Sequence, residues 1–182
     1  MKRALLLIDL QKDYFPGGAM ELDGSDDAVN RASELLDSFR RAVRPVIHIQ
    51  HVSVRPGATF FLPGTAGVEI HPSVAPLSGE TLFRKHYPNS FRETPLLEHL
   101  RALGPDQLVI AGMMTHMCVD TTTRAAADYG FSCELVHDAC ATRDLRFGER
   151  MVAAADVQTS YLAALDGSFA TVRTSADIAL EL

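Results

Sequence analysis

The chain of 182 residues contains few cysteines and no long apolar run. Its three cysteines, Cys118, Cys133 and Cys140, are an odd number, and no pair has C-x-x-C spacing. This argues against a disulfide scaffold or a thioredoxin-like motif and favours a reducing compartment. No stretch approaches the roughly 18 apolar residues of a membrane span, and the apolar start of the chain ends at Asp9, too early for a signal peptide. We therefore expect a cytoplasmic protein.

The sequence also has no cluster of positive charge. Its formal net charge is −6, from 17 Lys and Arg against 23 Asp and Glu. Nucleic acid and anionic membranes are therefore not expected as partners, whereas a small molecule is. Two motifs are missing as well. Without G-x-G-x-x-G after a strand and without G-x-S-x-G, neither a dinucleotide-binding protein nor a serine esterase is indicated.

Short apolar runs alternate with helical patterns along the chain, which has the composition of an ordinary globular protein, 47% apolar and 22% charged. This alternation predicts a single α/β domain over residues 1–182, a doubly wound and mainly parallel six-stranded sheet with helices on both faces. The expected strands are 4–8, 46–50, 81–84, 108–111, 131–136 and 170–172. The expected helices are 27–43, 95–102, 115–129 and 147–165.

One long irregular segment interrupts this alternation. Residues 51–79 are rich in Pro and Gly but include Phe60, Phe61 and Leu62. Loops of this length in a compact domain are usually functional or disordered. The apolar residues favour a lid or pocket wall, with disorder as the alternative.

Cys118 lies where an open α/β sheet binds its ligands. It follows the strand 108–111, the punctuating Gly112 and the expected helix cap Thr115, so it falls in the first turn of a helix that Gly130 ends. The free N–H groups and positive dipole of a helix start favour a thiolate and, later, an oxyanion. We interpret Cys118 as a nucleophile, against the alternative of a small buried apolar residue.

Two further polar residues stand at strand ends. Asp9 follows the first expected strand and Lys85 the third, so both should share one edge of the sheet with Cys118. Singly, Asp9 could cap a turn and Lys85 could be a surface charge. Together they supply a carboxylate to move a proton, an ammonium to hold the carboxylate, and a thiol to attack a carbonyl carbon.

Several segments resemble the isochorismatase-like cysteine hydrolases, a superfamily that includes nicotinamidases, N-carbamoylsarcosine and ureidoacrylate amidohydrolases, and isochorismatases. They span nearly the whole chain in the family order. The matching segments are LLIDLQKDYF (6–15), FLPGT (61–65) with IHP (70–72), KHYPNSF (85–91), VIAGMMTHMCV (109–119) and VHDA (136–139).

The resemblance implies a catalytic triad of Asp9, Lys85 and Cys118, with a thioester acyl-enzyme on Cys118 and Asp9 as general acid and base. It also implies a cis peptide bond between Met113 and Met114. The backbone N–H groups of Met114 and Cys118 would then form the oxyanion hole. Relatives of this kind suggest a homo-oligomer, a dimer or larger, in which a neighbouring subunit completes the pocket.

The nicotinamidases carry an Asp-x-His-x-x-x-His metal site that this chain does not reproduce. At that point it reads Ile49-Gln-His51-Val-Ser-Val-Arg55, so we expect no metal and no other cofactor. Together with the cysteine, this favours a metal-independent hydrolase for a C–N bond of a small amide, ureido or imide compound. The remaining alternative is a binding protein or a redox sensor with a reactive thiol at Cys118.

A set of aromatic, histidine and polar residues near these motifs is expected to wall the pocket. They suit a small, flat or apolar acyl group. We expect Cys133 and Cys140 to be packing residues, and Asp138 to brace the loop after the fifth strand. The expected pocket residues are Gln11, Phe15, His51, Phe60, Phe61, Tyr87, Met114 and His116.

Overall fold

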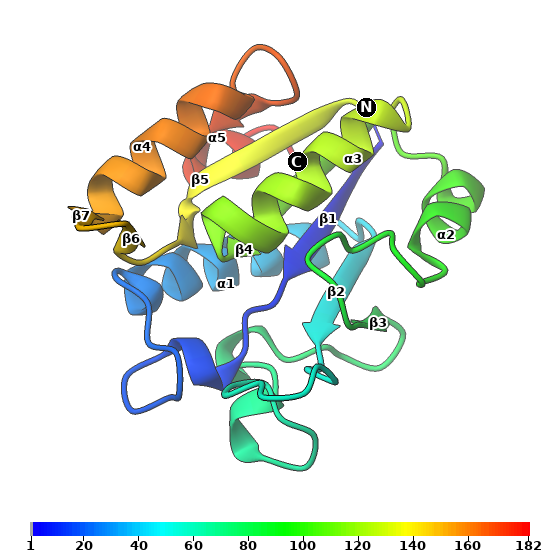
Figure 1. Ribbon diagram of the computed structural model, residues 1–182. Helices are drawn as coiled ribbons and strands as arrows, with labels where there is room; N and C mark the ends of the chain where they lie inside the picture. Colours follow the sequence, from blue (N-terminus) through cyan, green and yellow to red (C-terminus); the bar gives the residue numbers. More distant parts are fainter. Residues whose placement is uncertain (1) are drawn as a thin grey trace.

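The computed structural model describes residues 2–182 and contains a six-stranded sheet in which every neighbouring pair is parallel, in the order β3-β2-β1-β4-β5-β8 (Figure 1). The predicted fold class is therefore confirmed. The chain turns back at β1, because β2 and β3 extend the sheet on one side and β4, β5 and β8 on the other. The strands are β1 (Arg3–Ile8), β2 (Val46–His51), β3 (Thr81–Lys85), β4 (Gln107–Met113), β5 (Cys133–Ala141) and β8 (Thr171–Arg173).

Helices cover both faces of this sheet (Figure 1). Alternate residues of β1 explain the two layers: Leu5 and Leu7 pack with the apolar side of α1, whereas Leu6 and Ile8 pack toward α2, α3 and α4. All four β1 side chains are buried, as expected for a central parallel strand. The helices are α1 (Ser25–Arg41) and α5 (Ser175–Ala179) on one face, and α2 (Leu96–Leu103), α3 (Asp120–Asp128) and α4 (Ala154–Leu165) on the other.

The sheet is tightest where β4 passes β1. Gly112 has φ +134°, and a Cβ built there would lie 2.0 Å from the carbonyl oxygen of Ile8. Only glycine fits this close approach. β4 pairs with β5 irregularly at the same point, between Ile110 and Gly112. The end of β4 lies beside the end of β1 because the two strands pair regularly up to Ile8 and Gly112.

The second half of the chain differs from the predicted elements. β5 continues to Ala141, so the expected exit loop at residues 137–140 is part of the strand. A short antiparallel hairpin, β6 (Leu145–Phe147) and β7 (Arg150–Val152), replaces the first turns of the helix predicted from residue 147. Gly148 adopts φ +60° in the hairpin turn, a conformation that no helix continues. The terminal helix α5 was not predicted.

Asp138 and the two other cysteines have structural surroundings. Asp138 accepts hydrogen bonds from the backbone N–H and the hydroxyl of Ser175, at 2.8 and 2.9 Å, so it fixes the start of α5 instead of a loop. Cys133 and Cys140 are free and buried, and burial raises the pKa of each thiol to about 12. None of the helices within residues 2–182 is long and apolar enough to cross a membrane.

Candidate active site

Three side chains from distant parts of the chain meet at the carboxyl ends of the central strands. Asp9 follows β1, Lys85 ends β3, and Cys118 lies in the turn after β4. Their exposed fractions are 0%, 1% and 4%. The Lys85 ammonium is 2.7 Å from a carboxylate oxygen of Asp9. The Cys118 sulfur lies within 4.8 Å of an Asp9 oxygen and of a ring nitrogen of His51.

Asp9 reaches this position through an unusual backbone conformation. Its φ is +53°, in the left-handed region that Asp adopts more readily than most residues. Its backbone N–H still donates to the carbonyl of Ile49 at 3.0 Å, so β1 remains joined to β2 at this point. The turn directs the carboxylate into the site, where one of its oxygens, Oδ1, has no hydrogen-bond partner within residues 2–182.

Lys85 is held from several sides. Besides its ion pair with Asp9, its ammonium donates to the carbonyls of Tyr87 and Pro88 at 3.1 and 3.2 Å and approaches His51 Nδ1 at 3.4 Å. Burial lowers the pKa of Lys85, but the nearby Asp9 carboxylate more than offsets this, so the net shift is upward. The ammonium therefore keeps its charge in a buried position and fixes Asp9.

The helix after β4 opens with a π turn over Thr115–Val119, and α3 follows it. The Met114 carbonyl accepts from the N–H groups of Met117 and Val119 at 3.0 and 3.2 Å. The expected cap Thr115 is wrong, because its hydroxyl donates to the Ala141 carbonyl instead. The Met113–Met114 peptide bond is cis, at the position that the family resemblance implies. The Met114 N–H makes no hydrogen bond within residues 2–182.

The surroundings of Cys118 favour the thiol, not the thiolate expected for a helix start. Burial and the neighbouring Asp9 carboxylate raise the pKa of Cys118, and Lys85 offsets only part of this. In an apolar site, the cost of an unpartnered charge exceeds the contribution of a helix dipole. A base must therefore accept the thiol proton when the sulfur attacks, and Asp9 is the adjacent candidate.

A pocket of about 450 Å³ opens above Cys118. Four of the expected wall residues line it, namely His51, Phe60, Tyr87 and Met114. Sequence reasoning missed several others. The additional lining residues include Tyr14, Val54, Arg55, His86 and Met117.

Four expected wall residues lie outside the lining. Gln11 is fully buried and joins the His51 backbone to the Val68 carbonyl. Phe15 packs against His71, with ring centroids 4.3 Å apart. The other two are Phe61, which is 0% exposed beneath Phe60, and His116, whose Nδ1 lies 2.5 Å from the Thr142 hydroxyl.

The long segment after β2 is folded against the rest of the protein. Asp13 accepts a hydrogen bond from the backbone N–H of Phe61 at 2.6 Å. Gly67 approaches the Asp13 carboxylate so closely that a Cβ built there would lie 1.9 Å from it. The Phe61 ring packs on Tyr14 at 4.6 Å. These contacts hold the part of the segment that walls the pocket and exclude the expected alternative of disorder.

The residues near the site do not fit the nicotinamidase metal site. Gln50 stands beside His51 and is engaged with Val68 and Arg84, while His71 accepts from the Ser73 backbone. Asp9, His51 and Cys118 offer three ligand atoms close together. The ammonium of Lys85, 2.7 Å from Asp9, disfavours a second cation there.

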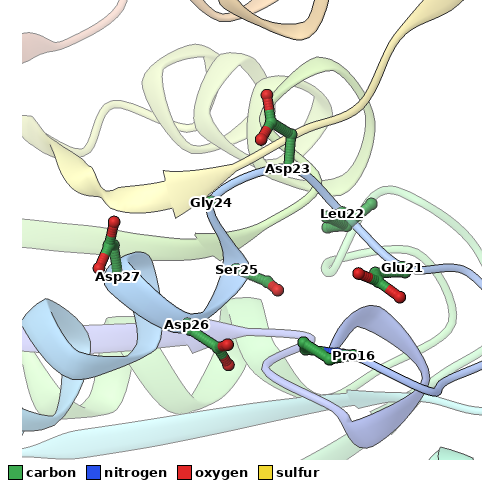
Figure 2. A pocket seen from close by; sticks show the side chains of 8 residues that line it. All are labelled: Pro16, Glu21, Leu22, Asp23, Gly24, Ser25, Asp26 and Asp27. Carbon is green, nitrogen blue, oxygen red and sulfur yellow. The ribbon is translucent and has the colours of Figure 1, made fainter.

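A separate hollow of about 610 Å³ lies at the start of α1, and Figure 2 shows its side chains. It shares no lining residue with the pocket above Cys118. Its lining contains no cysteine, histidine or basic residue, and we assign no reaction to it. The charged residues of this acidic hollow are Glu21, Asp23, Asp26 and Asp27.

Comparison with known proteins agrees with this arrangement. The isochorismatase domain model matches residues 3–177. The chain is 47% identical over 175 residues to the isochorismatase family protein YddQ of Bacillus subtilis, covering 96% of this chain and 97% of that one. It is 30% identical over 159 residues to the maleamate amidohydrolase of Pseudomonas putida, covering 78% and 73%.

A solved structure gives the same result for the fold. The crystal structure of an isochorismatase from Pseudomonas putida superposes with a TM-score of 0.90 at 39% identity, covering 96% of this chain and 89% of that one. The family model and the relatives together show that this chain belongs to the isochorismatase family of hydrolases.

Proposed function

We propose that the protein is a cysteine-dependent amidohydrolase that cleaves a C–N bond of a small amide, ureido or imide compound. The observation that carries this proposal is the position of Cys118 at the floor of the pocket, beside a buried carboxylate that is paired with a lysine. The family supports hydrolysis, and a relative named for amide hydrolysis supports the choice of a C–N bond.

In the first half of the reaction, the thiol proton of Cys118 passes to Asp9 as the sulfur attacks the substrate carbonyl carbon. The carbonyl oxygen becomes an oxyanion, which the backbone N–H groups of Met114 and Cys118 stabilise. One such donor contributes roughly 2.7–4 kcal/mol in other enzymes. Collapse of the intermediate breaks the C–N bond, and Asp9 returns its proton to the leaving nitrogen. The products are a free amine or ammonia and a thioester on Cys118.

In the second half, water attacks the thioester carbonyl and Asp9 accepts the water proton. The C–S bond then breaks, the carboxylic acid product leaves, and the proton returns to the Cys118 sulfur. The raised pKa of Cys118 fits this cycle, because the resting thiol carries the proton that the leaving nitrogen needs. Lys85 is a positioning residue, since its ammonium is tied to Asp9 and two backbone carbonyls.

The reaction as proposed needs no metal. The nicotinamidase ligand pattern is not met, and the Lys85 ammonium occupies the place beside Asp9 that a cation would take. The alternative of a redox sensor is less favoured. A sensor needs a thiolate, and the pKa of Cys118 is raised by burial.

The test is release of ammonia or amine from a panel of small amides and ureido compounds in buffer with a chelator. Wild-type protein is compared with Cys118→Ala and with Cys140→Ala, which removes a buried thiol outside the pocket. We expect turnover in the wild type and Cys140→Ala proteins and none in Cys118→Ala. Equal turnover in the wild type and Cys118→Ala proteins would exclude the nucleophile. Loss of turnover with the chelator would exclude a metal-free reaction.

The homo-oligomer, a neighbouring subunit that completes the pocket, and the cytoplasmic location stay predictions. The hairpin β6–β7 exposes Phe147 and Met151, which are 87% and 63% accessible in the single chain. Because large exposed apolar side chains are typical of contact surfaces, we propose this hairpin as a contact between copies. Light scattering should give a dimer or larger for the wild type and a smaller species for Phe147→Asp.

A further inference from the structure

The pocket above Cys118 differs in charge from the rest of the protein. The chain carries a net charge of −6 and the acidic hollow is lined by four carboxylates (Figure 2). In contrast, no Asp or Glu lines the pocket, whereas Arg55, His51 and His86 do. Asp9 lies beneath its floor, fully buried and paired with Lys85. A substrate that enters the pocket therefore meets no free negative charge.

The Tyr14 side chain is a nearly buried group with a polar end in the pocket wall. It is 1% exposed and packed between Phe60 and Phe61, yet it lines the pocket. Its hydroxyl makes no hydrogen bond within residues 2–182. Burial, and then the charges of Cys118 and Asp9, raise the pKa of Tyr14, so the hydroxyl keeps its proton. Because Tyr14 lines the pocket and its hydroxyl keeps its proton, this hydroxyl is free to donate a hydrogen bond to a ligand.

His51 offers a second donor. The Lys85 ammonium has no lone pair and lies 3.4 Å from His51 Nδ1, so a proton on Nδ1 would face a positive charge and the tautomer with Nδ1 unprotonated is favoured. Burial, with Lys85 adding to it, lowers the pKa of His51 to about 4, so the ring is neutral near pH 7 and its proton is on Nε2. This N–H has no hydrogen-bond partner among the described residues. It is available to an acceptor in the pocket.

Arg55 supplies the positive charge at the mouth of the pocket. It is exposed and makes no ion pair or hydrogen bond with another side chain within residues 2–182. The segment that carries it is fixed nearby, because the backbone N–H of Ser53 donates to the Phe61 carbonyl and that of Ala58 to the Arg55 carbonyl. A guanidinium that no protein carboxylate neutralises is suited to bind a carboxylate of a ligand.

We propose that the pocket selects amides whose acyl part carries a carboxylate, with Arg55 binding the carboxylate at the mouth and Tyr14 and His51 donating to acceptors nearer Cys118. This inference rests on the proposed function for the site and adds the substrate class. It makes Arg55 a specificity-determining residue. Its guanidinium distinguishes an anionic amide from a neutral or cationic amide of the same length.

The test is equilibrium binding of three probes of similar length by calorimetry to the Cys118→Ala protein, in which no turnover interferes. The probes are succinamate, with one carboxylate, the neutral succinamide, and the cationic β-alaninamide. In this background we compare Arg55 with Arg55→Gln and Arg55→Lys. Arg101→Gln is the matched control, because it removes another exposed arginine, from the C-terminal end of α2, away from the pocket and from the β6–β7 hairpin.

We expect succinamate to bind about tenfold more tightly than succinamide, with β-alaninamide weakest, because succinamate alone offers a carboxylate to the guanidinium and the site is partly open to solvent. Arg55→Gln should weaken succinamate about fivefold or more and leave succinamide unchanged, Arg55→Lys should lie between, and Arg101→Gln should match the parent. Tyr14→Phe should weaken both amides.

The inference would be overturned if succinamate and succinamide bound equally, or if β-alaninamide bound more tightly than succinamate. It would also be overturned if succinamate did not bind at 10 times the concentration at which another probe binds, or if none of the three bound. Turnover by the wild type separates this failure from failure of the hydrolase proposal. Turnover that prefers neutral or cationic amides would overturn the substrate class alone. Arg55-dependent binding without any turnover would overturn the hydrolase alone.

Discussion

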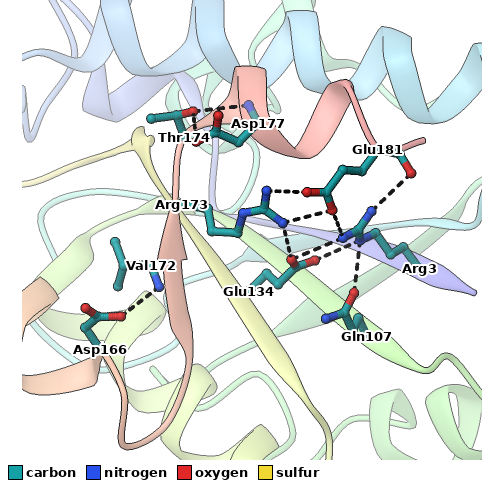
Figure 3. Close-up of polar contacts among 9 residues, drawn as sticks. All are labelled: Arg3, Gln107, Glu134, Asp166, Val172, Arg173, Thr174, Asp177 and Glu181. Atoms are coloured by element: carbon teal, nitrogen blue, oxygen red, sulfur yellow. Dashed lines mark hydrogen bonds and ion pairs between the residues drawn. The ribbon is translucent and has the colours of Figure 1, made fainter. Parts of the chain in front are cut away.

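The two ends of β1 each carry an ionic cluster, which is partly exposed at the start of the strand and fully buried at its end, and the clusters are built differently. At the start of the strand, Arg3 pairs with Glu134 at 2.9 Å, and Arg173 and Glu181 complete the group, as Figure 3 shows. Both Glu134 oxygens accept from guanidinium groups, and Arg3 also donates to Gln107. Every charge in this cluster has several partners, so nothing remains to bind a ligand.

At the other end of the same strand, Asp9 is paired with Lys85 through one oxygen only. Within residues 2–182 its Oδ1 has no hydrogen-bond partner, although the side chain is fully buried. An unsatisfied buried carboxylate destabilises the fold, whereas it is well placed to accept a proton. The ion pairs at the start of β1 therefore stabilise the fold. At its end, the partly unsatisfied Asp9 carboxylate lowers stability but is able to accept a proton.

The largest effect on activity should come from removing the Asp9 carboxylate. Asp9→Asn keeps the shape but cannot accept the thiol proton, so kcat should fall by about 10²–10⁴-fold, the usual contribution of a general acid–base. Steady-state kinetics on the best amide of the panel measures this. Asp138→Asn is the control, because that carboxylate only holds Ser175. If Asp9→Asn kept at least a tenth of wild-type kcat, Asp9 would not be the general base, and the two ends of β1 would not differ in catalytic role.

The largest effect on stability should come from Lys85→Met. It leaves the Asp9 charge buried without a partner, and losing one partner of a buried ion pair costs about 3–5 kcal/mol of unfolding free energy. Urea unfolding of the single variant, of Asp9→Asn and of the double variant measures the pair. The double variant should regain part of the loss without regaining activity. If it unfolds as easily as Lys85→Met, the buried charge is not the cause.

Glu134→Gln, in the cluster at the start of β1, should lower stability and leave activity unchanged. The amide keeps an acceptor but removes the charge that Arg3 and Arg173 share, so we expect a loss of about 1.5–3 kcal/mol in unfolding free energy. Because the change lies at the far end of β1 from Cys118, kcat and KM should stay within about twofold of wild type, as is usual for changes without shared partners. A large change in kcat at full stability would contradict this separation of roles.

How far the sequence predicts the site depends on the kind of information each residue needs. Asp9, Lys85 and Cys118 were expected together because parallel strands end at one edge, and the structure brings them within one site. This inference needs only strand order and element ends. Whether those residues perform catalysis stays a prediction for the kinetics above.

The pocket wall was predicted less well, because it depends on local rotations that periodicity does not describe. Tyr14 and Phe15 are neighbours in a short 3-10 turn, and only Tyr14 faces the pocket. Similarly, Phe60 lines the pocket and Phe61 is buried, since the Asp13 carboxylate fixes the backbone at Phe61. The β6–β7 hairpin was missed for a related reason, because its exposed apolar residues resemble the first turn of a helix.

The smallest predicted effects concern acid. His51 and His116, near Cys118, have their pKa values lowered to about 4 by burial, so below about pH 6.5 the unfolded chain binds protons that the folded protein does not. Stability should therefore fall as the pH drops from about 6.5 to about 4. At the other end of β1, hydrogen bonds from Arg173 and Arg3 lower the pKa of Glu181 to about 2, so its contribution is lost only below about pH 4.5.

The two ends should thus respond to acid in separate windows. Urea unfolding at pH 7, 5 and 3.5 measures both. His116→Gln should flatten the decline between pH 7 and 5, by about 1–2 kcal/mol for a buried imidazole with this pKa, and Glu181→Gln should flatten only the decline below pH 4.5. If Glu181→Gln changed the upper window instead, the two clusters would be coupled through β1, and the division between a stabilising end and a reactive end of the strand would not hold.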